Sequence, residues 1–297
     1  MKIIPVFLFC LVCVGHSNAQ QIFSMSQFMQ HNFIYNPAAA GASDQASLGI
    51  TYKKMWAGIE GGPRTTMLYA DKYFEAFNTG GGLILYNDVT GPITRSGVEG
   101  CVSYGIYTSD YNQLKFGLSG QLLQERIDKA AVQKYIPDDP LLATAGSSTT
   151  GDAAFGVYYT TPKLNIGVSA KQLVQSKLNF IKTTTLNESR LYRHYYVMGS
   201  YNYQLDSQNV LIPNFIIKMA AHSPFDFEAG ARLEHKKLLW FGINYHYQQY
   251  YSAFLGFNIN KKVSLGYAYD QYRTPLSIFD EGGGSHELSL KYYFEPR

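Results

Sequence analysis

Charged side chains are scarce in this sequence. Asp, Glu, Lys and Arg account for 16% of its 297 residues, whereas they make up about a quarter of ordinary soluble domains. The two signs nearly cancel, and the formal net charge of +3 is too small to indicate binding to nucleic acid. The sequence therefore lacks the charged surface that a soluble domain of this length normally presents to water.

Long apolar runs are missing after residue 19. No later stretch approaches the roughly 20 consecutive apolar residues of a membrane-spanning helix. Mean hydropathy is near neutral at −0.16, although the chain contains 25 Tyr and 18 Phe. These features together fit a membrane β-barrel, whose strands face lipid on one side and water on the other.

Residues 1–19 have the pattern of a secretory signal peptide. Lys2 supplies the positive start, and residues 3–14 form an apolar run that is too short to span a bilayer. The tripeptide Ser17-Asn18-Ala19 places small residues where a signal peptidase reads them. We therefore expect export and cleavage before Gln20.

Cysteine is rare as well. Cys10 and Cys13 lie within the predicted signal peptide, and neither follows the small residues of a lipoprotein signal. Cys101 is then alone in the exported chain, which cannot form an internal disulfide. A disulfide-stabilised scaffold is thereby excluded, and no lipid anchor is expected.

The alternation of side chains is clearest in the last stretch, residues 285–294. One row is apolar and the other is mostly polar: Leu288, Leu290, Tyr292 and Phe294 against Glu287, Ser289, Lys291 and Tyr293. Successive side chains of a strand point to opposite faces, so this pattern predicts a strand with one apolar and one polar side. We interpret it as the strand that pairs with the first one and closes a transmembrane barrel.

The same alternation recurs along the chain and predicts about fourteen antiparallel strands. Their expected ranges are 46–53, 65–74, 80–87, 97–107, 114–122, 155–159, 164–171, 195–204, 215–219, 225–234, 239–247, 253–259, 263–270 and 285–294. The segment before them does not alternate and is expected at the periplasmic mouth or in the lumen. The predicted fold is all-β, with a signal peptide at 1–19, this segment at 20–45 and an outer-membrane β-barrel at 46–297.

The expected connections differ in length between the two ends of the strands. Long ones are expected near residues 55–64, 125–152, 172–192 and 273–285, with a further loop at 88–94. Short ones are expected near residues 75–79, 108–112, 161–163, 206–209, 235–237 and 260–262. Short periplasmic turns with longer external loops are typical of outer-membrane barrels. A secreted soluble β-sandwich, the alternative all-β fold, has no reason to sort its loops in this way.

Catalytic motifs are not evident. The sequence contains no G-x-S-x-G, no H-E-x-x-H and no phosphate-binding loop with a Lys. His222 near Asp226 suggests a hydrolase, but the pattern places no serine nucleophile beside them. Asp138 and Asp139 suggest a calcium site or an acid pair, but the prolines on either side favour a rigid turn. We therefore predict no enzyme, no cofactor and no metal.

The predicted inner face is polar, which leaves a passive or substrate-specific pore as an alternative function. Its charges, however, have both signs, as in Asp226, Glu228, Arg232 and Glu234. Rings of one sign would be expected for ion selection, and none is evident.

Specific motifs are distributed over the whole exported sequence. They are Ser26-Gln27-Phe28-Met29, Asn36-Pro37-Ala38-x-Ala40-Gly41, Tyr52-Lys53-x-x-Trp56-x-Gly58-Ile59-x-Gly61-x-Pro63-x-Thr65, Asp88-x-x-Gly91-Pro92, Pro137-Asp138-Asp139-Pro140, Arg193-His194-Tyr195, Leu255-Gly256-Phe257-x-Ile259, Leu265-Gly266-Tyr267-Ala268-Tyr269-Asp270 and Gly284-Ser285-His286-Glu287. Together they resemble the PorP/SprF family of the type IX secretion system in Bacteroidota. Gly62 is a small departure, because Ala is expected before the proline.

The resemblance implies a non-enzymatic outer-membrane barrel that acts in protein secretion, in surface display of proteins with a type IX C-terminal domain and, for some members, in gliding motility. It also implies a periplasmic peptidoglycan-binding lipoprotein as a partner. We expect external loops 55–64, 125–152 and 172–192 to hold the secreted protein, and segment 20–44 with the short turns to meet periplasmic partners. The candidate partner-binding residues within these motifs are Asn36, Pro37, Trp56, Pro63, Asp138 and Asp139.

Overall fold

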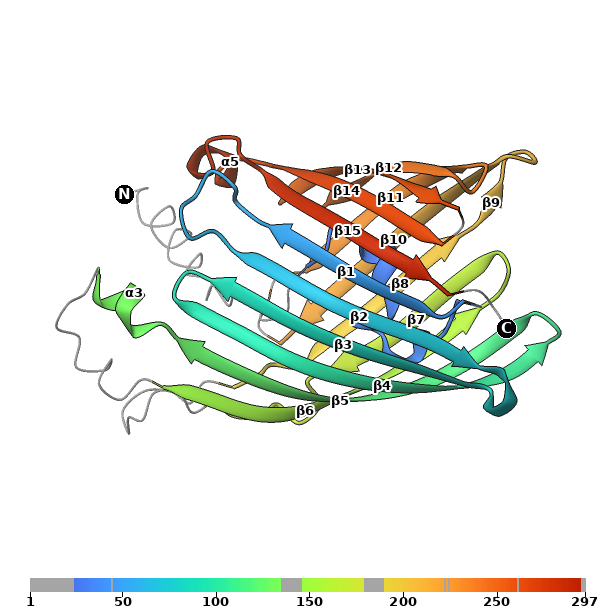
Figure 1. Ribbon diagram of the computed structural model, residues 1–297, viewed down its shortest axis with the longest axis horizontal. Helices are drawn as coiled ribbons and strands as arrows, with labels where there is room; N and C mark the ends of the chain where they lie inside the picture. Colours follow the sequence, from blue (N-terminus) through green and yellow to red (C-terminus); the bar gives the residue numbers. More distant parts are fainter. Residues whose placement is uncertain are drawn as a thin grey trace, which may run out of the picture.

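The strands form one antiparallel sheet that closes on itself. The computed structural model describes residues 24–43, 45–134, 146–178, 190–221, 223, 225–260 and 262–294. Consecutive strands pair side by side, and the last strand pairs with the first. The result is a barrel of tilted strands (Figure 1). Closure removes the free strand edges that an open sheet would expose in a membrane.

The strand bounds are close to the expected ranges. In chain order the strands are β1 Ser47–Lys54, β2 Arg64–Phe74, β3 Thr79–Thr90, β4 Ile93–Ser109, β5 Asn112–Ile127, β6 Ser147–Thr160, β7 Leu164–Lys171, β8 His194–Tyr201, β9 Tyr203–Gln204, β10 Asn209–Ala220, β11 Asp226–His235, β12 Leu239–His246, β13 Tyr250–Ile259, β14 Val263–Tyr272 and β15 Ser285–Tyr293. Both β8 and β9 pair with β10 and form one interrupted strand. The described residues thus form a fourteen-stranded barrel, which confirms the predicted fold.

The interruption between β8 and β9 has a local cause. Ser200 pairs with Asn214 and Tyr203 pairs with Leu211, so the register is the same on both sides of the break. Between these pairs lies Pro213, which has no N–H to donate to the neighbouring strand. The ladder loses a hydrogen bond at this point without a shift in the strand order.

Alternating side chains separate the two faces of the barrel. In β1 the burial pattern alternates strictly, with the apolar side chains of Leu48 and Ile50 outside and Thr51 inside. The closing strand β15 shows the same division, since Leu288 is 58% exposed whereas Glu287 is 1% exposed. The outer face therefore presents apolar side chains, as a lipid-facing surface requires, and the inner face is polar.

The closing seam has a continuous register. Eight residues of β1 pair with eight of β15, and Ile50 lies opposite Leu290 near the centre of the seam. Beyond the strands, the N–H of Phe294 donates to the carbonyl of Ala46 (2.9 Å). The expectation that the last strand pairs with the first is confirmed.

The connections differ at the two ends of the barrel. At one end, which we call the turn end, they are short, with η4 Glu75–Phe77 in the first of them. The other end, which we call the loop end, carries the long connections, with α3 Lys129–Gln133 and α5 Leu276–Phe279 (left in Figure 1). Among the described residues, no helix is long and apolar enough to cross a membrane.

Two expected loops are shorter than predicted. The strands β3 and β4 continue through most of the predicted loop 88–94 and leave a tight turn at Gly91 and Pro92. Likewise β5 extends to Ile127 and β6 begins at Ser147, inside the predicted loop 125–152. Polar residues interrupt the apolar row there, and the alternation that predicts a lipid-facing strand is lost although the backbone pairing continues.

A non-strand segment lies inside the barrel. Residues 24–43, which we call the plug, contain η2 Phe28–His31, α2 Asn32–Tyr35 and η3 Pro37–Ala39. The plug lies within the ring of strands (blue in Figure 1). Its apolar side chains form a core with inward residues of the wall; the buried members are Met25, Phe28, Phe33, Ile34, Tyr35, Ala38, Ala39, Ala40, Met67, Tyr69, Ile84, Cys101, Tyr158, Tyr196, Met198 and Ile216. The hydrophobic core therefore lies in the lumen.

Replacement of Ile50 by Arg is expected to destabilise the barrel by about 2–4 kcal/mol, the cost of a cation in the apolar part of a bilayer. Ile50 is outward-facing and lies near the middle of the closing seam. Denaturant titration of the protein in lipid vesicles measures this loss. The matched control is Tyr111→Arg, at a residue that is 78% exposed in a short turn; an equal loss in both variants would contradict the assignment of the lipid-facing row.

Candidate functional site

The plug crosses the lumen from the loop end to the turn end. Near its start, Ser24 Oγ accepts a hydrogen bond from Lys218 Nζ (2.7 Å), close to the loop end of β10. Near its exit, the carbonyls of Ala40 and Gly41 accept from Lys115 Nζ (2.9 and 3.0 Å), close to the turn end of β5. One lysine of the wall thus holds each end of the plug.

Asn36 and Pro37 position the middle of the plug against the wall. The side chain of Asn36 caps η3 by accepting from the N–H of Ala38 (2.9 Å), and Pro37 occupies the first helical position, where an N–H is not needed. The Asn36 amide also donates to the carbonyls of Val157 and Val168 (3.0 and 3.2 Å). One side chain therefore fixes both the local turn and its contact with strands β6 and β7.

Glycines of the wall make this close approach possible. A Cβ at Gly156 would collide with Asn36 Oδ1, and a Cβ at Gly117 would collide with the backbone of Ala38. The small residues Ala38 to Ala40 make the complementary contribution from the plug, and all three are buried. Backbone therefore packs directly on backbone at this contact.

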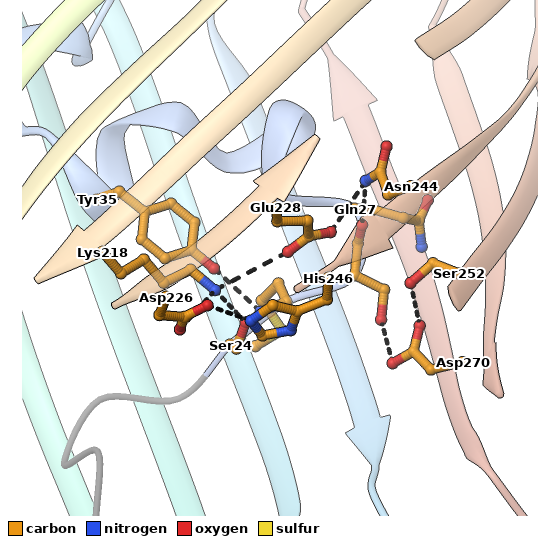
Figure 2. A network of polar contacts seen from close by, with 12 residues as sticks. Ser24, Gln27, Tyr35, Lys218, Asp226, Glu228, Asn244, His246, Ser252 and Asp270 are labelled. Carbon is orange, nitrogen blue, oxygen red and sulfur yellow. Dashed lines mark hydrogen bonds and ion pairs between the residues drawn. The ribbon is translucent and has the colours of Figure 1, made fainter. Parts of the chain in front are cut away.

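A cluster of buried charges holds the first residues of the plug. Glu287 accepts from the backbone N–H groups of Ser26 (2.6 Å) and Gln27 (3.1 Å). Lys53 Nζ donates to Ser26 Oγ (2.8 Å) and pairs with Asp270 Oδ2 (2.9 Å). Ser26 Oγ in turn donates to the same Asp270 oxygen (2.8 Å), and Ser252 Oγ donates to the other oxygen of Asp270 (2.6 Å) (Figure 2). Lys53, Asp270 and Glu287 are each 1% exposed, so their charges depend on one another.

A second cluster lies beside the first. Lys218 Nζ is 3.9 Å from a carboxylate oxygen of Asp226 and 3.9 Å from one of Glu228. His246 Nε2 contacts Asp226, and the Asn244 amide donates to Glu228 (3.0 Å) (Figure 2). Of the predicted mixture of charges on the inner face, Asp226 and Glu228 are thus buried beside Lys218. Arg232 and Glu234 pair with each other and are partly exposed.

A third ion pair ties the centre of the plug to the opposite wall. Lys171 Nζ pairs with Glu99 (2.8 Å) and donates to the carbonyl of Ile34 (2.7 Å). Ser169 Oγ donates to the backbone carbonyl of Tyr35 (2.7 Å). The side-chain hydroxyl of Tyr35 accepts from the N–H of Met25 (3.0 Å) within the plug. Polar contacts therefore connect the plug with the wall along its whole length.

The two predicted residues of the first long loop lie at the loop end. The N–H of Met55 donates to the carbonyl of Pro63 (2.7 Å). Trp56 has a positive φ of 51°, and its buried indole N–H has no hydrogen-bond partner among the residues that the structure describes. The carboxylate of Asp280 accepts from the N–H of Gly58 (3.1 Å) and from that of Gly284. This holds the 55–63 connection against the last loop.

The six predicted site residues do not form one site. Asn36 and Pro37 are buried in the plug, whereas Trp56 and Pro63 lie in the connection between β1 and β2 at the loop end. Asp138 and Asp139 lie outside the described residues. Because Asn36 is fully buried and bonded within the barrel, it is not exposed to a partner in this conformation. A role of these residues in partner binding is still a prediction.

The contacts that sequence reasoning missed are those between plug and wall. The sequence feature that could have indicated these contacts is the position of five charged residues on the predicted inner rows: Lys53, Glu99, Lys171, Asp270 and Glu287. Which of them meet across the lumen depends on barrel closure. The described residues contain no group of three or more potential metal ligands. Of the residues weighed for a hydrolase, Asp226 contacts the buried side chains of Lys218 and His246, and His222 lies outside the described residues.

Four of the quoted motifs meet in one cluster. Ser26, Lys53, Asp270 and Glu287 come from four separate motifs, and they contact one another in the lumen. A sequence model of type IX secretion system membrane proteins PorP/SprF matches residues 17–292. The chain belongs to the PorP/SprF family. The resemblance predicted from the motifs is confirmed, and this protein is a membrane protein of the type IX secretion system with an outer-membrane barrel fold.

Solved outer-membrane channels have a similar barrel. The CymD monoaromatic hydrocarbon channel has a TM-score of 0.52 at 11% identity, with 95% of this chain and 96% of that chain covered. A FadL homologue of Pseudomonas aeruginosa has a TM-score of 0.51 at 12% identity, covering 88% and 93%. The toluene transporter TbuX of Ralstonia pickettii has a TM-score of 0.50 at 10% identity, covering 89% and 93%. At these identities the similarity shows the fold alone. No curated protein sequence matches the chain.

Replacement of Glu287 by Ala is expected to loosen the plug of this PorP/SprF protein. The backbone N–H groups of Ser26 and Gln27 would lose their buried acceptor, at about 1–3 kcal/mol for each group. Hydrogen–deuterium exchange in the peptide that contains both amides should therefore become faster. Glu75→Ala removes an exposed carboxylate at the turn end and is the control. Unchanged protection in Glu287→Ala would show that this carboxylate does not hold the plug.

Proposed function

We propose that this PorP/SprF protein is a closed, non-enzymatic barrel that binds secreted proteins at its loop end and anchors them at the cell surface. On this proposal the secreted protein carries a type IX C-terminal domain, and the turn end contacts a peptidoglycan-binding lipoprotein in the periplasm. Export through a signal peptide cleaved before Gln20 belongs to the same proposal. The proposal is compatible with a role of the protein in gliding, in secretion or in surface attachment.

The observation that supports this proposal is the filled lumen. The plug packs an apolar core against the wall and engages Lys53, Lys171, Lys218 and Lys115 by hydrogen bonds. A barrel that is filled in this way offers its two rims, rather than its lumen, to other molecules. The two rims differ in character, because the loop end carries the long connections and the turn end carries the short ones.

At the external rim, hydrogen bonds hold the first and last long connections against each other, and such an ordered surface favours binding. Asp280 is fully buried and joins the last long connection to the first one through the N–H of Gly58. A backbone bond from the N–H of Ala57 to the carbonyl of Gly284 (2.8 Å) adds to this joint. Loops that are already ordered lose less conformational entropy on binding, which favours external loop 55–64 as part of the surface for the secreted protein.

The plug itself contributes little surface for a periplasmic partner. Most of its residues from Met25 to Gly41 are buried, and only its last residues at the turn end, such as Ser43, are exposed. We therefore place the proposed periplasmic contact on the short turns and on the exit of the plug, rather than on the whole of segment 20–44.

The pore alternative is tested by conductance in planar bilayers. The purified protein is expected to carry no large steady current, whereas a variant that lacks residues 24–41 is expected to conduct, because the deletion empties the lumen. Electrophoresis in SDS shows whether the shortened barrel folds, because a folded barrel migrates differently before and after the sample is heated. A large steady current from the unaltered protein would favour the pore and overturn the closed barrel.

The assignment of the two rims is tested by photo-crosslinking in native membranes. A crosslinking side chain at Glu60, exposed in the first external loop, is expected to capture the secreted protein. The same side chain at Asp110, exposed in a short turn, is expected to capture the periplasmic lipoprotein. Mass spectrometry identifies the captured partners. Capture of the periplasmic lipoprotein from Glu60, or of the secreted protein from Asp110, would contradict the proposed orientation.

A further inference from the structure

Three basic side chains form a row on the outer face of the barrel at the loop end. They are Arg64 in β2, Lys54 in β1 and His286 in β15, on three adjacent strands (Figure 1). The register places Lys54 directly opposite Arg64 on one side and directly opposite His286 on the other. All three lie on outward rows, because the next strand residue in sequence is in each case buried inside the barrel. We call these three residues the basic row.

The cations of the basic row have no counter-ion within the described part of the chain. Lys54 and Arg64 are exposed, and no described carboxylate forms an ion pair with them or with His286. Like charges that face each other directly across two strands repel and destabilise the pair. An anion that bridges Lys54 and Arg64 converts this repulsion into two attractive contacts.

Tyrosines place the basic row at the level of the lipid headgroups. Tyr52 precedes Lys54 by two residues on the same outward row, and Tyr269 lies directly opposite His286. Tyrosine is enriched at the membrane–water interface, where its ring contacts apolar chains and its hydroxyl contacts water. Charged side chains just beyond such tyrosines reach the polar headgroups of the lipid.

The imidazole of His286 is held in place as a third donor. The Tyr267 hydroxyl lies 2.7 Å from His286 Nδ1, and the ring of Tyr269 is 5.3 Å from the imidazole between centroids. With the Tyr267 hydroxyl as the donor, the imidazole hydrogen is on Nε2. This N–H group then remains to donate beside the two cations.

An apolar groove of about 440 Å³ adjoins the basic row on the same outer face. It extends over β13, β14, β15 and β1, and its residues from β15 and β1 are Tyr52, Ile50, Leu288, Ser289 and Leu290. Tyr52 faces Leu288, and these two are the next outward residues after Lys54 and His286. The groove therefore runs from the basic row toward the centre of the closing seam. Its volume is within the range of about 300–1,000 Å³ that is typical of ligand sites.

We propose that the basic row and the groove together bind one anionic lipid whose headgroup carries a phosphomonoester. The phosphate lies between Lys54 and Arg64, and an acyl chain of the same molecule lies in the groove. The guanidinium group of Arg64 presents paired N–H donors that match two phosphate oxygens, and the ammonium group of Lys54 adds a second positive charge.

The two parts of the site have different tasks. Acyl chains in a bilayer are as apolar as leucine side chains, so the groove positions the lipid and contributes little selectivity. The basic row selects the charge of the headgroup. Only the choice of leaflet depends on the proposed orientation: with the loop end outside the cell, the bound lipid belongs to the outer leaflet.

The test is native mass spectrometry of the full-length protein in detergent micelles that contain two lipids in equal amounts. Dimyristoyl phosphatidate carries a phosphomonoester, whereas dimyristoyl phosphatidylcholine has the same acyl chains and no net charge. Loss of a charged hydrogen bond lowers affinity by about tenfold or more, so the phosphatidate should bind at least tenfold more tightly. Glycerol 3-phosphate, which lacks acyl chains, should not displace the phosphatidate at equal concentration.

Variants assign the preference to the basic row. The double variant Lys54→Gln/Arg64→Gln should abolish the preference for phosphatidate, and Lys54→Arg should retain it. Arg126→Gln is the matched control, because Arg126 is exposed near the loop end of β5 and lies opposite the uncharged residues Thr94 and Ser147. It should leave the preference unchanged.

Thermal unfolding gives an independent measurement that also shows whether the variants fold. Binding to the folded state alone raises the unfolding midpoint. Phosphatidate should therefore raise the midpoint of the unaltered protein and of Arg126→Gln, but not that of the double variant. Without lipid, the double variant should be at least as stable as the unaltered protein, because it removes two like charges from opposite positions.

A variant at the groove tests the site of the acyl chain. Leu265 of β14 lines the groove, and Leu265→Trp should lower the binding of phosphatidate although the basic row is intact. Phe241→Trp, at an exposed outward residue of β12 that does not line the groove, is the control and should bind phosphatidate normally.

Four outcomes would overturn the proposal: equal binding of the two lipids, a preference that survives in the double variant, displacement by glycerol 3-phosphate, or undiminished binding in Leu265→Trp. These measurements need neither a secreted protein nor a periplasmic partner. Failure of the crosslinks from Glu60 and Asp110 therefore refutes the proposed function alone, and failure of the lipid preference refutes the lipid site alone.

Discussion

The structure depends on the pairing of charges that the wall turns into the lumen. In a water-filled barrel such charges are solvated, but here protein occupies the lumen and each buried charge needs a partner. Lys53, Asp270 and Glu287 satisfy one another together with the hydroxyl of Ser26 and the backbone of the plug. The contacts that neutralise the wall therefore also hold the plug, and closure of the lumen follows from the same electrostatic requirement.

The plug also solves a problem of size. An eight-stranded barrel is just narrow enough for its own side chains to fill, and wider barrels leave space inside. In this fourteen-stranded barrel the plug supplies Phe28, Phe33 and Ile34, which pack against inward apolar residues of the wall. Apolar residues are thus used twice, outside against lipid and inside as a core. Glycine in the wall allows the plug to approach closely, with its backbone at Gly117 and with the side chain of Asn36 at Gly156.

Much of the fold was predictable from the sequence, because a strand that separates lipid from a polar interior must alternate with a period of two. The row of Leu288 and Leu290 against Glu287 and Lys291 identified the closing strand correctly. The errors occurred where that constraint ends. Both ends of the predicted loop 88–94 and both ends of the predicted loop 125–152 belong to strands that continue with polar residues on the outer row, so the pairing persists after the alternation has stopped.

By itself, the sequence determined the family, the all-β barrel, the number of strands and the inner or outer direction of each row, since all of these depend on local periodicity and local motifs. The tertiary structure alone decided that the segment before the barrel fills the lumen, and that Asn36 lies against Val157 and Val168. It also decided that Glu287 reaches Ser26, 261 residues away in the chain. Such contacts cross the lumen between distant strands, and no local pattern records which inward side chains face each other once the sheet has closed.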